Sequence, residues 1–278
     1  MTEHRIPLAG VIGNPVAHSR SPALHGHWLR RYGLPGHYVP MHVEAADLPA
    51  VLRTLPRAGF VGVNVTIPHK EAALKAADLV TDRAALIGAA NTLIFRPDGK
   101  IHADNTDGYG FLSSLRQDAP QWQPASGPAA VLGAGGAARA ILFALLEAGA
   151  PEVRIANRSR GRAEGLRGEF GARVTVWDWH RAEEMMEDCA TVVNTTALGM
   201  AGAPDLRLTL AHLPQRAVVT DIVYTPLETG FLRAARARGC SAVDGLGMLL
   251  HQAVPGFERW FGRRPEVDDD LRRAVLPG

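Results

Sequence analysis

The sequence predicts an α/β protein with two domains. An apolar run followed by a glycine-rich turn occupies residues 129–138, near the middle of the chain. Strand-like segments alternate with helix-like segments on both sides of this turn, a pattern typical of α/β folds. The 278 residues are enough for two domains of ordinary size. Because the glycine-rich unit starts only at Ala129, we expect a separate domain before it.

The first part of the chain predicts a largely parallel or mixed sheet with helices between its strands. Ser21-Pro22 is a typical helix start, and Arg96-Pro97-Asp98-Gly99 predicts a hairpin turn. The expected strands are 6–12, 37–43, 61–65, 90–95 and 100–103. The expected helices are 21–31, 46–58, 70–79 and 107–116.

The second part repeats the alternation after a proline-containing approach at 117–128. The expected strands are 129–132, 152–156, 173–176, 191–193, 217–222 and 241–243. The expected helices include 137–147 and a long C-terminal helix at 245–261.

The glycine-rich turn has the spacing of a dinucleotide-binding βαβ unit. Gly133 permits a tight turn, Gly135 lets the backbone approach a pyrophosphate, and Ala138 takes the third, small position. The following helix would direct its N-terminal N–H groups at the anion. An ordinary glycine turn is the alternative, but the second apolar strand follows at the distance that a βαβ unit requires. The candidate cofactor residues here are Gly133, Ala134, Gly135, Gly136 and Ala137.

The residues after the second strand of this unit favour NADP over NAD. NAD sites usually place Asp or Glu there, about 20 residues past the glycines, to bind the ribose 2′-OH. This chain instead has Asn157-Arg158-Ser159-Arg160-Gly161-Arg162, without a carboxylate. Arginine offers fork-shaped donors to a 2′-phosphate. We therefore expect Arg158 and Arg162 to bind it, whereas Arg160 fits a solvated helix start.

Composition excludes several classes of protein. The chain is 46% hydrophobic and 21% charged, with a formal charge of +2, which does not suggest nucleic-acid or membrane binding. Cys189 and Cys240 are the only cysteines and lack zinc-site spacing, so we expect no metal and no disulfide framework. The N-terminal residues 1–5 lead into a strand-like segment without a signal peptide. We expect a cytoplasmic protein.

Four polar clusters occur where a core would be apolar. In 13–22, hydroxyls and amides follow a strand and could hold an anion, although Ser21 could instead cap a helix with Pro22 at its first position. In 62–70, Asn64, Thr66 and Pro68 alternate with apolar residues and should share one strand face.

The same cluster ends at Lys70, which opens a helix, where the helix dipole disfavours a cation and so favours proton transfer. Taken alone, Lys70 fits a solvated surface residue better, because most lysines are of that kind. The third cluster contains Asn91, a turn candidate, and Asp107, a possible N-cap. The fourth contains Tyr224 and Gln252, which could be core-edge residues.

Together these clusters resemble the shikimate dehydrogenase family over nearly the whole chain, from about residue 10 to 262. The sequence contains, in the family's order, G-N-P-x-x-H-S-x-S-P, N-V-T-x-P-x-K, N-T-D-G-x-G, G-A-G-G-A-A-R, N-R-S and G-x-G-M-L-x-x-Q. The resemblance implies reversible reduction of 3-dehydroshikimate to shikimate with NADPH, on the route to chorismate and the aromatic amino acids. It also implies a substrate-binding domain over 1–106, completed by 246–278, and a Rossmann-like NADP domain over 107–245, with a cleft between them.

The resemblance also assigns roles to individual residues. Lys70 and Asp107 would be the catalytic pair. Ser19 and Ser21 would bind the substrate carboxylate. The other substrate-binding residues would be Asn64, Thr66, Asn91, Tyr224 and Gln252. Besides the glycine-rich turn, the cofactor would contact Asn157, Arg158, Ser159, Arg162, Gly245 and Met248. A small polar acid needs directional donors and acceptors of this kind more than apolar area.

Three positions depart from the family's usual pattern. Gly26 stands where Asn commonly follows the histidine, His69 replaces an apolar or aromatic residue, and Ser159 replaces Thr. The function alternatives are a quinate/shikimate or aminoshikimate dehydrogenase of the same family and a non-catalytic NADPH-binding sensor. Both serines favour shikimate, and retention of Lys70 and Asp107 argues against a sensor. The expected partner is a small molecule, with no nucleic acid or membrane, and a homodimer is the oligomer to test.

Overall fold

The computed structural model describes residues 6–276, so the expectation about residues 1–5 lies outside the described part. The chain divides into two compact units, each described separately below. The first unit comprises Met1–Thr106 and Gln252–Gly278, and the second comprises Asp107–His251. The second division falls between His251 and Gln252, inside one long helix, α10 (Gly245–Phe261).

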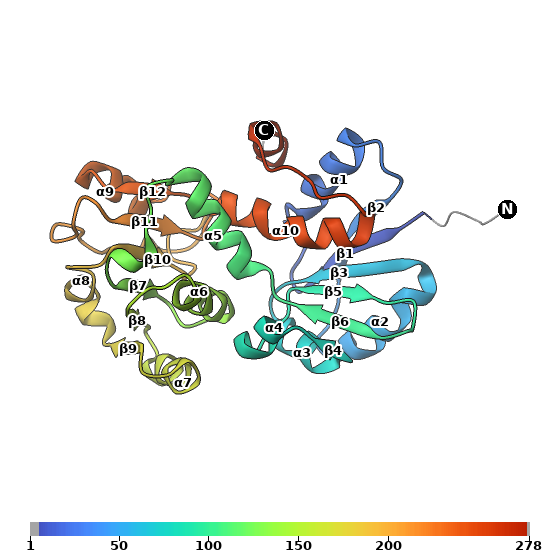
Figure 1. Ribbon diagram of the computed structural model, residues 1–278, viewed down its shortest axis with the longest axis horizontal. Coiled ribbons are helices and arrows are strands. Elements are labelled where there is room, and N and C mark those ends of the chain that lie inside the picture. Colours follow the sequence, from blue (N-terminus) through green and yellow to red (C-terminus); the bar gives the residue numbers. More distant parts are fainter. Residues whose placement is uncertain (1–5, 277–278) are drawn as a thin grey trace. The chain divides into compact units, whose positions relative to one another are not determined.

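The first unit contains a mixed six-stranded sheet in the order β2-β1-β3-β5-β6-β4 (Figure 1). β1 pairs in parallel with β2 and β3, β4 pairs in parallel with β6, and β5 pairs antiparallel with both β3 and β6. The β5–β6 pair is the hairpin that the sequence predicts. The strands are β1 (Leu8–Gly13), β2 (His37–His42), β3 (Phe60–Val65), β4 (Leu79–Val80), β5 (Thr92–Phe95) and β6 (Ile101–Asp104).

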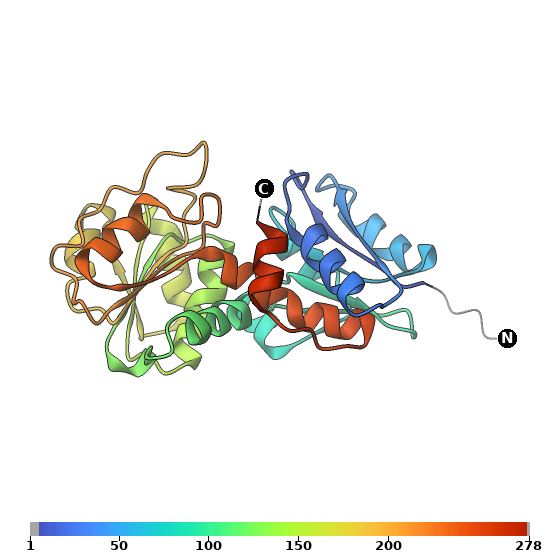
Figure 2. The same ribbon diagram turned by 90° about the horizontal axis from the view of Figure 1, so that it is seen from above.

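Helices pack on this sheet through an apolar core. One cluster joins Ile12, Val63 and Leu93 of the strands to Leu48 and Leu52 of a helix. Trp28, in helix α1 (Ser21–Arg31), packs edge-on against Phe257 of α10. Figure 2 shows α1 and the C-terminal part of α10 side by side. Besides the C-terminal part of α10, the helices are α1 (Ser21–Arg31), α2 (Leu48–Thr54), α3 (Lys70–Ala76), α4 (Asp82–Ile87) and α11 (Asp269–Val275).

The second unit contains a fully parallel six-stranded sheet in the order β12-β11-β10-β7-β8-β9. From β7 the strands are added toward one edge of the sheet as far as β9, and from β10 they are added toward the other edge. The boundary between β7 and β10 is therefore the topological switch point of a Rossmann-like fold. The strands are β7 (Ala129–Leu132), β8 (Val153–Ala156), β9 (Val174–Trp177), β10 (Thr191–Asn194), β11 (Val218–Asp221) and β12 (Ser241–Val243).

Both faces of this sheet are buried, as a parallel sheet requires. Along β7, Ala129 and Val131 belong to one apolar cluster, whereas Ala130 and Leu132 belong to another. The helices of the unit are α5 (Asp107–Asp118), α6 (Gly136–Glu147), α7 (Arg160–Phe170), α8 (Ala182–Met185) and α9 (Gly230–Arg238). The sequence therefore predicts the fold class correctly.

Two expected helices of the first unit differ from the structure. The helix expected over 46–58 becomes α2 followed by a 3-10 helix, Leu55–Ala58, because Pro56 has no N–H for a helical bond. The helix expected over 70–79 ends at Ala76, since the Asp78 N–H donates to the Ile101 carbonyl and draws the backbone to the sheet. Helices α4, α8, α9 and α11 are short and were not expected.

Within residues 6–276, no helix has both the length and the apolar character needed to cross a bilayer.

A glycine of the first sheet generates a prediction about stability. A Cβ on Gly62 would lie 2.0 Å from Trp260 Nε1 and 2.3 Å from the Leu93 carbonyl oxygen. Only glycine at this position therefore permits the observed close approach of β3 to α10. Gly62→Ala should therefore lower the free energy of unfolding by about 1–3 kcal/mol, the range for overpacking. Urea denaturation measures the change.

Gly26→Ala is the matched control, since its Cβ would meet only the flexible Arg30 guanidinium at 3.3 Å. Alanine inside helix α1 should be neutral or stabilising by up to about 1 kcal/mol. Equal stability of the Gly62→Ala variant and the unmodified protein would contradict the close approach.

Candidate functional site

The amide of Asn91 connects three segments of the first unit. Its Oδ1 accepts hydrogen bonds from the Thr106 N–H at 2.8 Å and from Thr92 Oγ1 at 3.0 Å. Its Nδ2 donates to Thr106 Oγ1 at 3.0 Å and to Gln252 Oε1 at 3.3 Å. All four residues are buried. The structure thus brings two predicted substrate residues, Asn91 and Gln252, into one hydrogen-bonded cluster.

Asn64 belongs to the same cluster, and three protein groups bind its amide. Nδ2 donates to the Asn91 carbonyl and to Thr92 Oγ1, both at 3.1 Å. Oδ1 accepts from the phenol of Tyr38 at 2.7 Å. Asn64 therefore holds β3, β5 and β2 in register, a positional role that the sequence did not indicate.

Ser19 and Ser21 lie at the start of α1, but not in the capping arrangement considered for Ser21. Helix α1 begins at Ser21 itself, and Arg20 occupies the N-cap position without a side-chain bond. Ser19 Oγ instead accepts from the Ser21 N–H at 3.3 Å. The capping interpretation of Ser21 is therefore wrong, because Ser19, two residues earlier, supplies the acceptor.

Lys70 is the first residue of α3, at the helix end where the sequence places it. Its carbonyl accepts from the Ala90 N–H at 2.9 Å, which ties the helix start to the residue before Asn91. Strand β3 ends at Val65, so Pro68, which was expected to share its face with Asn64, lies in the turn that follows, whereas the Thr66 N–H still bonds the Ile12 carbonyl of β1 at 2.8 Å.

His69 faces the core and is 1% exposed. Its Nε2 lies 2.8 Å from the Val43 carbonyl, an acceptor, so this nitrogen carries the proton. The imidazole thus anchors the loop before α3.

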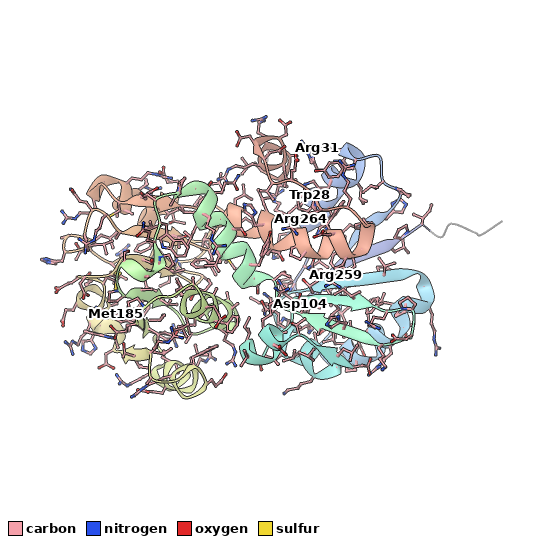
Figure 3. All side chains as sticks on the ribbon, viewed as in Figure 1. Trp28, Arg31, Asp104, Met185, Arg259 and Arg264 are labelled. Atoms are coloured by element: carbon pink, nitrogen blue, oxygen red, sulfur yellow. The ribbon has the colours of Figure 1, made fainter. Side chains whose placement is uncertain are left out.

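Asp104, at the end of β6, fixes the segment that leads into Asp107 (Figure 3). Its carboxylate accepts hydrogen bonds from Nε and Nη2 of Arg83, and one from Thr81 Oγ1 at 2.8 Å. Burial alone would raise the pKa of Asp104, but Arg83 outweighs it and holds that pKa below its usual value. Asp107 begins α5 three residues later and is buried.

In the second unit, the predicted cofactor turn lies at the switch point of the sheet. Gly133 has φ +107°, and a Cβ on it would lie 2.6 Å from Thr195 Oγ1 in the loop after β10. A Cβ on Gly135 or Gly136 would meet nothing within 4 Å, and α6 starts at Gly136. The exposed helix N-terminus and its small residues fit a bound pyrophosphate.

The three arginines after β8 differ in their partners. Arg160 forms ion pairs with Asp178 at 2.6 Å and Glu164 at 3.0 Å. Within residues 6–276, Arg158 and Arg162 form no ion pair, and both are exposed. Ser159 is the N-cap residue of α7 without a side-chain capping bond, and Asn157 Nδ2 bonds the Ser159 carbonyl at 2.8 Å. The charge pattern therefore fits a 2′-phosphate at Arg158 and Arg162.

Tyr224 lies in the loop after β11, which a buried carboxylate organises. Asp221 accepts from the Val223 N–H and Asn194 Nδ2, both at 3.0 Å, and from Thr229 Oγ1 at 2.8 Å. Burial raises the pKa of Asp221, and these three donors oppose the shift. Asp221 was not among the residues expected from the sequence, although it lies only three residues before Tyr224.

The remaining predicted cofactor residues lie at the start of α10. A Cβ on Gly245 would be 2.4 Å from the Ile222 carbonyl oxygen, so this glycine permits contact with the loop after β11. Met248 is partly buried against the apolar core of the unit. In the described part of the chain, no three His, Cys, Asp or Glu side chains are grouped as metal ligands.

Three family models match this chain: the shikimate dehydrogenase substrate binding domain at residues 11–93, shikimate / quinate 5-dehydrogenase at 120–203, and the shikimate 5′-dehydrogenase C-terminal domain at 245–275. The protein named shikimate dehydrogenase (NADP(+)) of Cereibacter sphaeroides is 69% identical over 277 residues, covering 99% of each chain. This chain belongs to the shikimate dehydrogenase family.

Two solved structures of the family also match closely. Shikimate 5-dehydrogenase from Thermus thermophilus, in complex with NADP(H) and shikimate, has a TM-score of 0.85 and 40% identity, covering 96% of this chain and 98% of that chain. Quinate dehydrogenase from Corynebacterium glutamicum, in complex with NAD, has a TM-score of 0.88 and 31% identity, covering 96% of both chains. The family thus includes members named for two substrates and crystallised with two cofactors.

The difference between the arginines predicts cofactor choice. Replacing Arg158 and Arg162 together by Ala should raise the KM for NADP at least about tenfold, because charge-assisted hydrogen bonds to the phosphate are lost. The KM for NAD, which lacks that phosphate, should change little. Steady-state kinetics with each cofactor measures both values.

Arg160→Ala is the matched control, because its guanidinium is already held by Asp178 and Glu164. It should leave the KM for NADP within about twofold of normal. If Arg160→Ala raised that KM as much as the double variant, the assignment to Arg158 and Arg162 would be wrong.

Proposed function

We propose that this protein is an NADP-dependent shikimate dehydrogenase that reversibly reduces 3-dehydroshikimate to shikimate, on the route to chorismate. One observation carries the proposal. Hydrogen bonds lead from the Lys70 carbonyl to Ala90, and from the adjacent Asn91 to Thr106, the residue before Asp107. One network therefore holds the backbone of Lys70 and the residue directly before Asp107.

The first unit supplies most of the proposed substrate contacts. Ser19 and Ser21 donate their hydroxyl protons to the substrate carboxylate near the start of α1. Thr66, Asn91 and Gln252 bind the ring hydroxyls, and Tyr224, in the loop after β11, is the remaining substrate residue of this proposal. Asn64 contributes mainly by holding Asn91 and Thr92 in place, since its own donors already serve them.

Lys70 and Asp107 carry out the proton transfer in this proposal. A ketone that is reduced develops negative charge on its oxygen, and the Lys70 ammonium stabilises this charge and donates a proton to it. Asp107 orients the ammonium and takes part in the return of the proton. In the oxidation direction, Lys70 accepts the hydroxyl proton of shikimate.

The second unit would hold NADP. Gly133, Ala134, Gly135, Gly136 and Ala137 would receive the pyrophosphate, and Asn157, Arg158, Ser159 and Arg162 the 2′-phosphate. Gly245 and Met248 would lie near its nicotinamide end. When bound, the reduced cofactor supplies the hydride.

The quinate-oxidising alternative is supported by the similarity to a quinate dehydrogenase. Quinate carries an additional hydroxyl on the carbon that bears the carboxylate. Two serines near the carboxylate, Ser19 and Ser21, favour shikimate, and the absence of an acid after β8 favours NADP. A non-catalytic sensor would need neither Lys70 nor Asp107.

We also propose that the enzyme acts in the cytoplasm, where the buried thiols Cys189 and Cys240 would stay reduced. A homodimer is the proposed oligomer, and light scattering on the purified protein tests it.

Initial rates test the proposed function directly. Shikimate and quinate should each be assayed with NADP and with NAD. Shikimate with NADP should give the highest kcat/KM of the four pairs. A higher value for quinate, or with NAD, would replace the proposal by its alternative, and no oxidation with any pair would refute both.

The catalytic pair predicts a non-additive loss of activity. Lys70→Ala should lower kcat by about 10²–10⁴, the range for a positioned acid–base group, with smaller effects on KM. Asp107→Ala should cause a comparable loss. The double variant should lose much less than the product of the two, because groups that act together are not additive.

Lys75→Ala, in the last turn of the same helix, is the control and should retain normal kcat. Multiplicative losses in the double variant, or near-normal kcat in Lys70→Ala, would assign the chemistry to other residues.

A further inference from the structure

A stack of aromatic rings lies behind the polar cluster of the first unit. The rings of His25 and Tyr38 are parallel within 3°, with centroids 3.9 Å apart. Phe257 and Trp260 of α10 approach the same imidazole, with centroids at 5.8 Å and 5.7 Å. Trp28 meets it edge-on at 5.8 Å. The position of the Tyr38 ring is thus set by residues from α1 and α10.

The phenol end of Tyr38 reaches residues assigned to substrate binding. Its hydroxyl donates to Asn64 Oδ1 at 2.7 Å. Burial raises the pKa of Tyr38 well above its usual value, and a hydrogen bond with Ser21 opposes this shift. Tyr38 therefore contacts both Asn64 and Ser21, and it stays a neutral donor during the reaction.

We propose that Tyr38 is a positioning residue of the substrate site and that His25 acts as the ring that holds it in place. This inference rests on the proposed function. Tyr38 orients Asn64, which in turn bonds Asn91 and Thr92. Loss of its hydroxyl would leave the buried Asn64 oxygen unpaired and let the amide turn.

His25 provides a ring rather than an acid or a base. The side chain is 0% exposed, and burial lowers its pKa to about 3, an effect that a side-chain hydrogen bond with Asn64 opposes only partly. Asn64 is the polar group that opposes this shift, and no well-aligned hydrogen bond reaches either ring nitrogen of His25 from another described residue. The neutral imidazole therefore contributes mainly by packing on Tyr38.

Tyr38→Phe is the primary test, because it keeps the ring stack and removes only the hydroxyl. The KM for shikimate should rise at least about fivefold, the lower limit for an unpaired buried polar group. The KM for NADP should stay within about twofold, and kcat should change less than the KM for shikimate.

Tyr32→Phe is the matched control in the same unit. The Tyr32 hydroxyl also takes part in a hydrogen bond, here as the acceptor from the Glu266 N–H at 3.0 Å, but outside the polar cluster. It should leave the KM for shikimate unchanged even if it lowers the Tm. A normal KM in Tyr38→Phe, or an equal rise in Tyr32→Phe, would overturn the proposal.

The His25 part is tested by a pair of variants. His25→Ala removes the ring and should raise the KM for shikimate and lower the Tm. His25→Phe restores a ring of similar shape without nitrogen atoms and should return the KM to within about twofold of normal. If His25→Phe remained as impaired as His25→Ala, the ring nitrogens would have a role, and the proposal that His25 acts only as a ring packed on Tyr38 would be wrong.

The proposed function and this inference fail in different ways. If the unmodified protein does not oxidise shikimate, the proposed function fails, and the orientation of Asn64 then decides the inference. Crystal structures of the unmodified protein and Tyr38→Phe provide that readout. An Asn64 amide that keeps its orientation and its bonds to Asn91 and Thr92 in the variant would overturn the positioning role.

Discussion

The organisation of the first unit depends on the buried amide of Asn91. In a dry interior, an amide that loses its partners costs more than a hydrogen bond contributes, so every group around Asn91 must remain in place. Its oxygen and nitrogen hold Thr92 on β5, Thr106 before α5 and Gln252 on α10. The next residue toward the N-terminus, Ala90, binds the Lys70 carbonyl. The Asn91 side chain therefore holds the residue before Asp107, and the backbone of the adjacent Ala90 holds the Lys70 carbonyl.

In the second unit, close backbone packing and one buried carboxylate hold the loops that carry the proposed site residues. Gly133 lets the turn after β7 pass within contact of Thr195, and Gly245 lets α10 start against the Ile222 carbonyl. Asp221 binds three donors and holds the loop that carries Tyr224. These contacts join the ends of β7, β10 and β11, where the strand order reverses and open α/β sheets bind their ligands.

Local sequence patterns predicted several elements of both units to the residue. These are Ala129–Leu132 and Ser241–Val243 of the second unit, Ser21–Arg31 of the first, and Gly245–Phe261, which spans both. Apolar strands and amphipathic helices carry their own local signal. The helix expected over 70–79 ends early because of a bond between Asp78 and Ile101, a contact between distant residues that no local pattern contains. For the same reason, motifs indicated Asn64, Asn91 and Gln252 but could not show that they form one cluster. Tyr38 carried no signal at all, since an isolated tyrosine in a strand is usually a core residue.

The hydrogen bonds that hold Asn64 and Asn91 to protein partners also bear on how the site would bind its substrate. Side chains that must find their rotamers during binding lose conformational entropy, which weakens affinity. Here the amides are already held by protein partners, and an aromatic stack fixes Tyr38 from behind. The cost of this order was met when the chain folded. A small polar acid that contributes little apolar area needs such a site, because its affinity depends on donors and acceptors that are in position before it arrives.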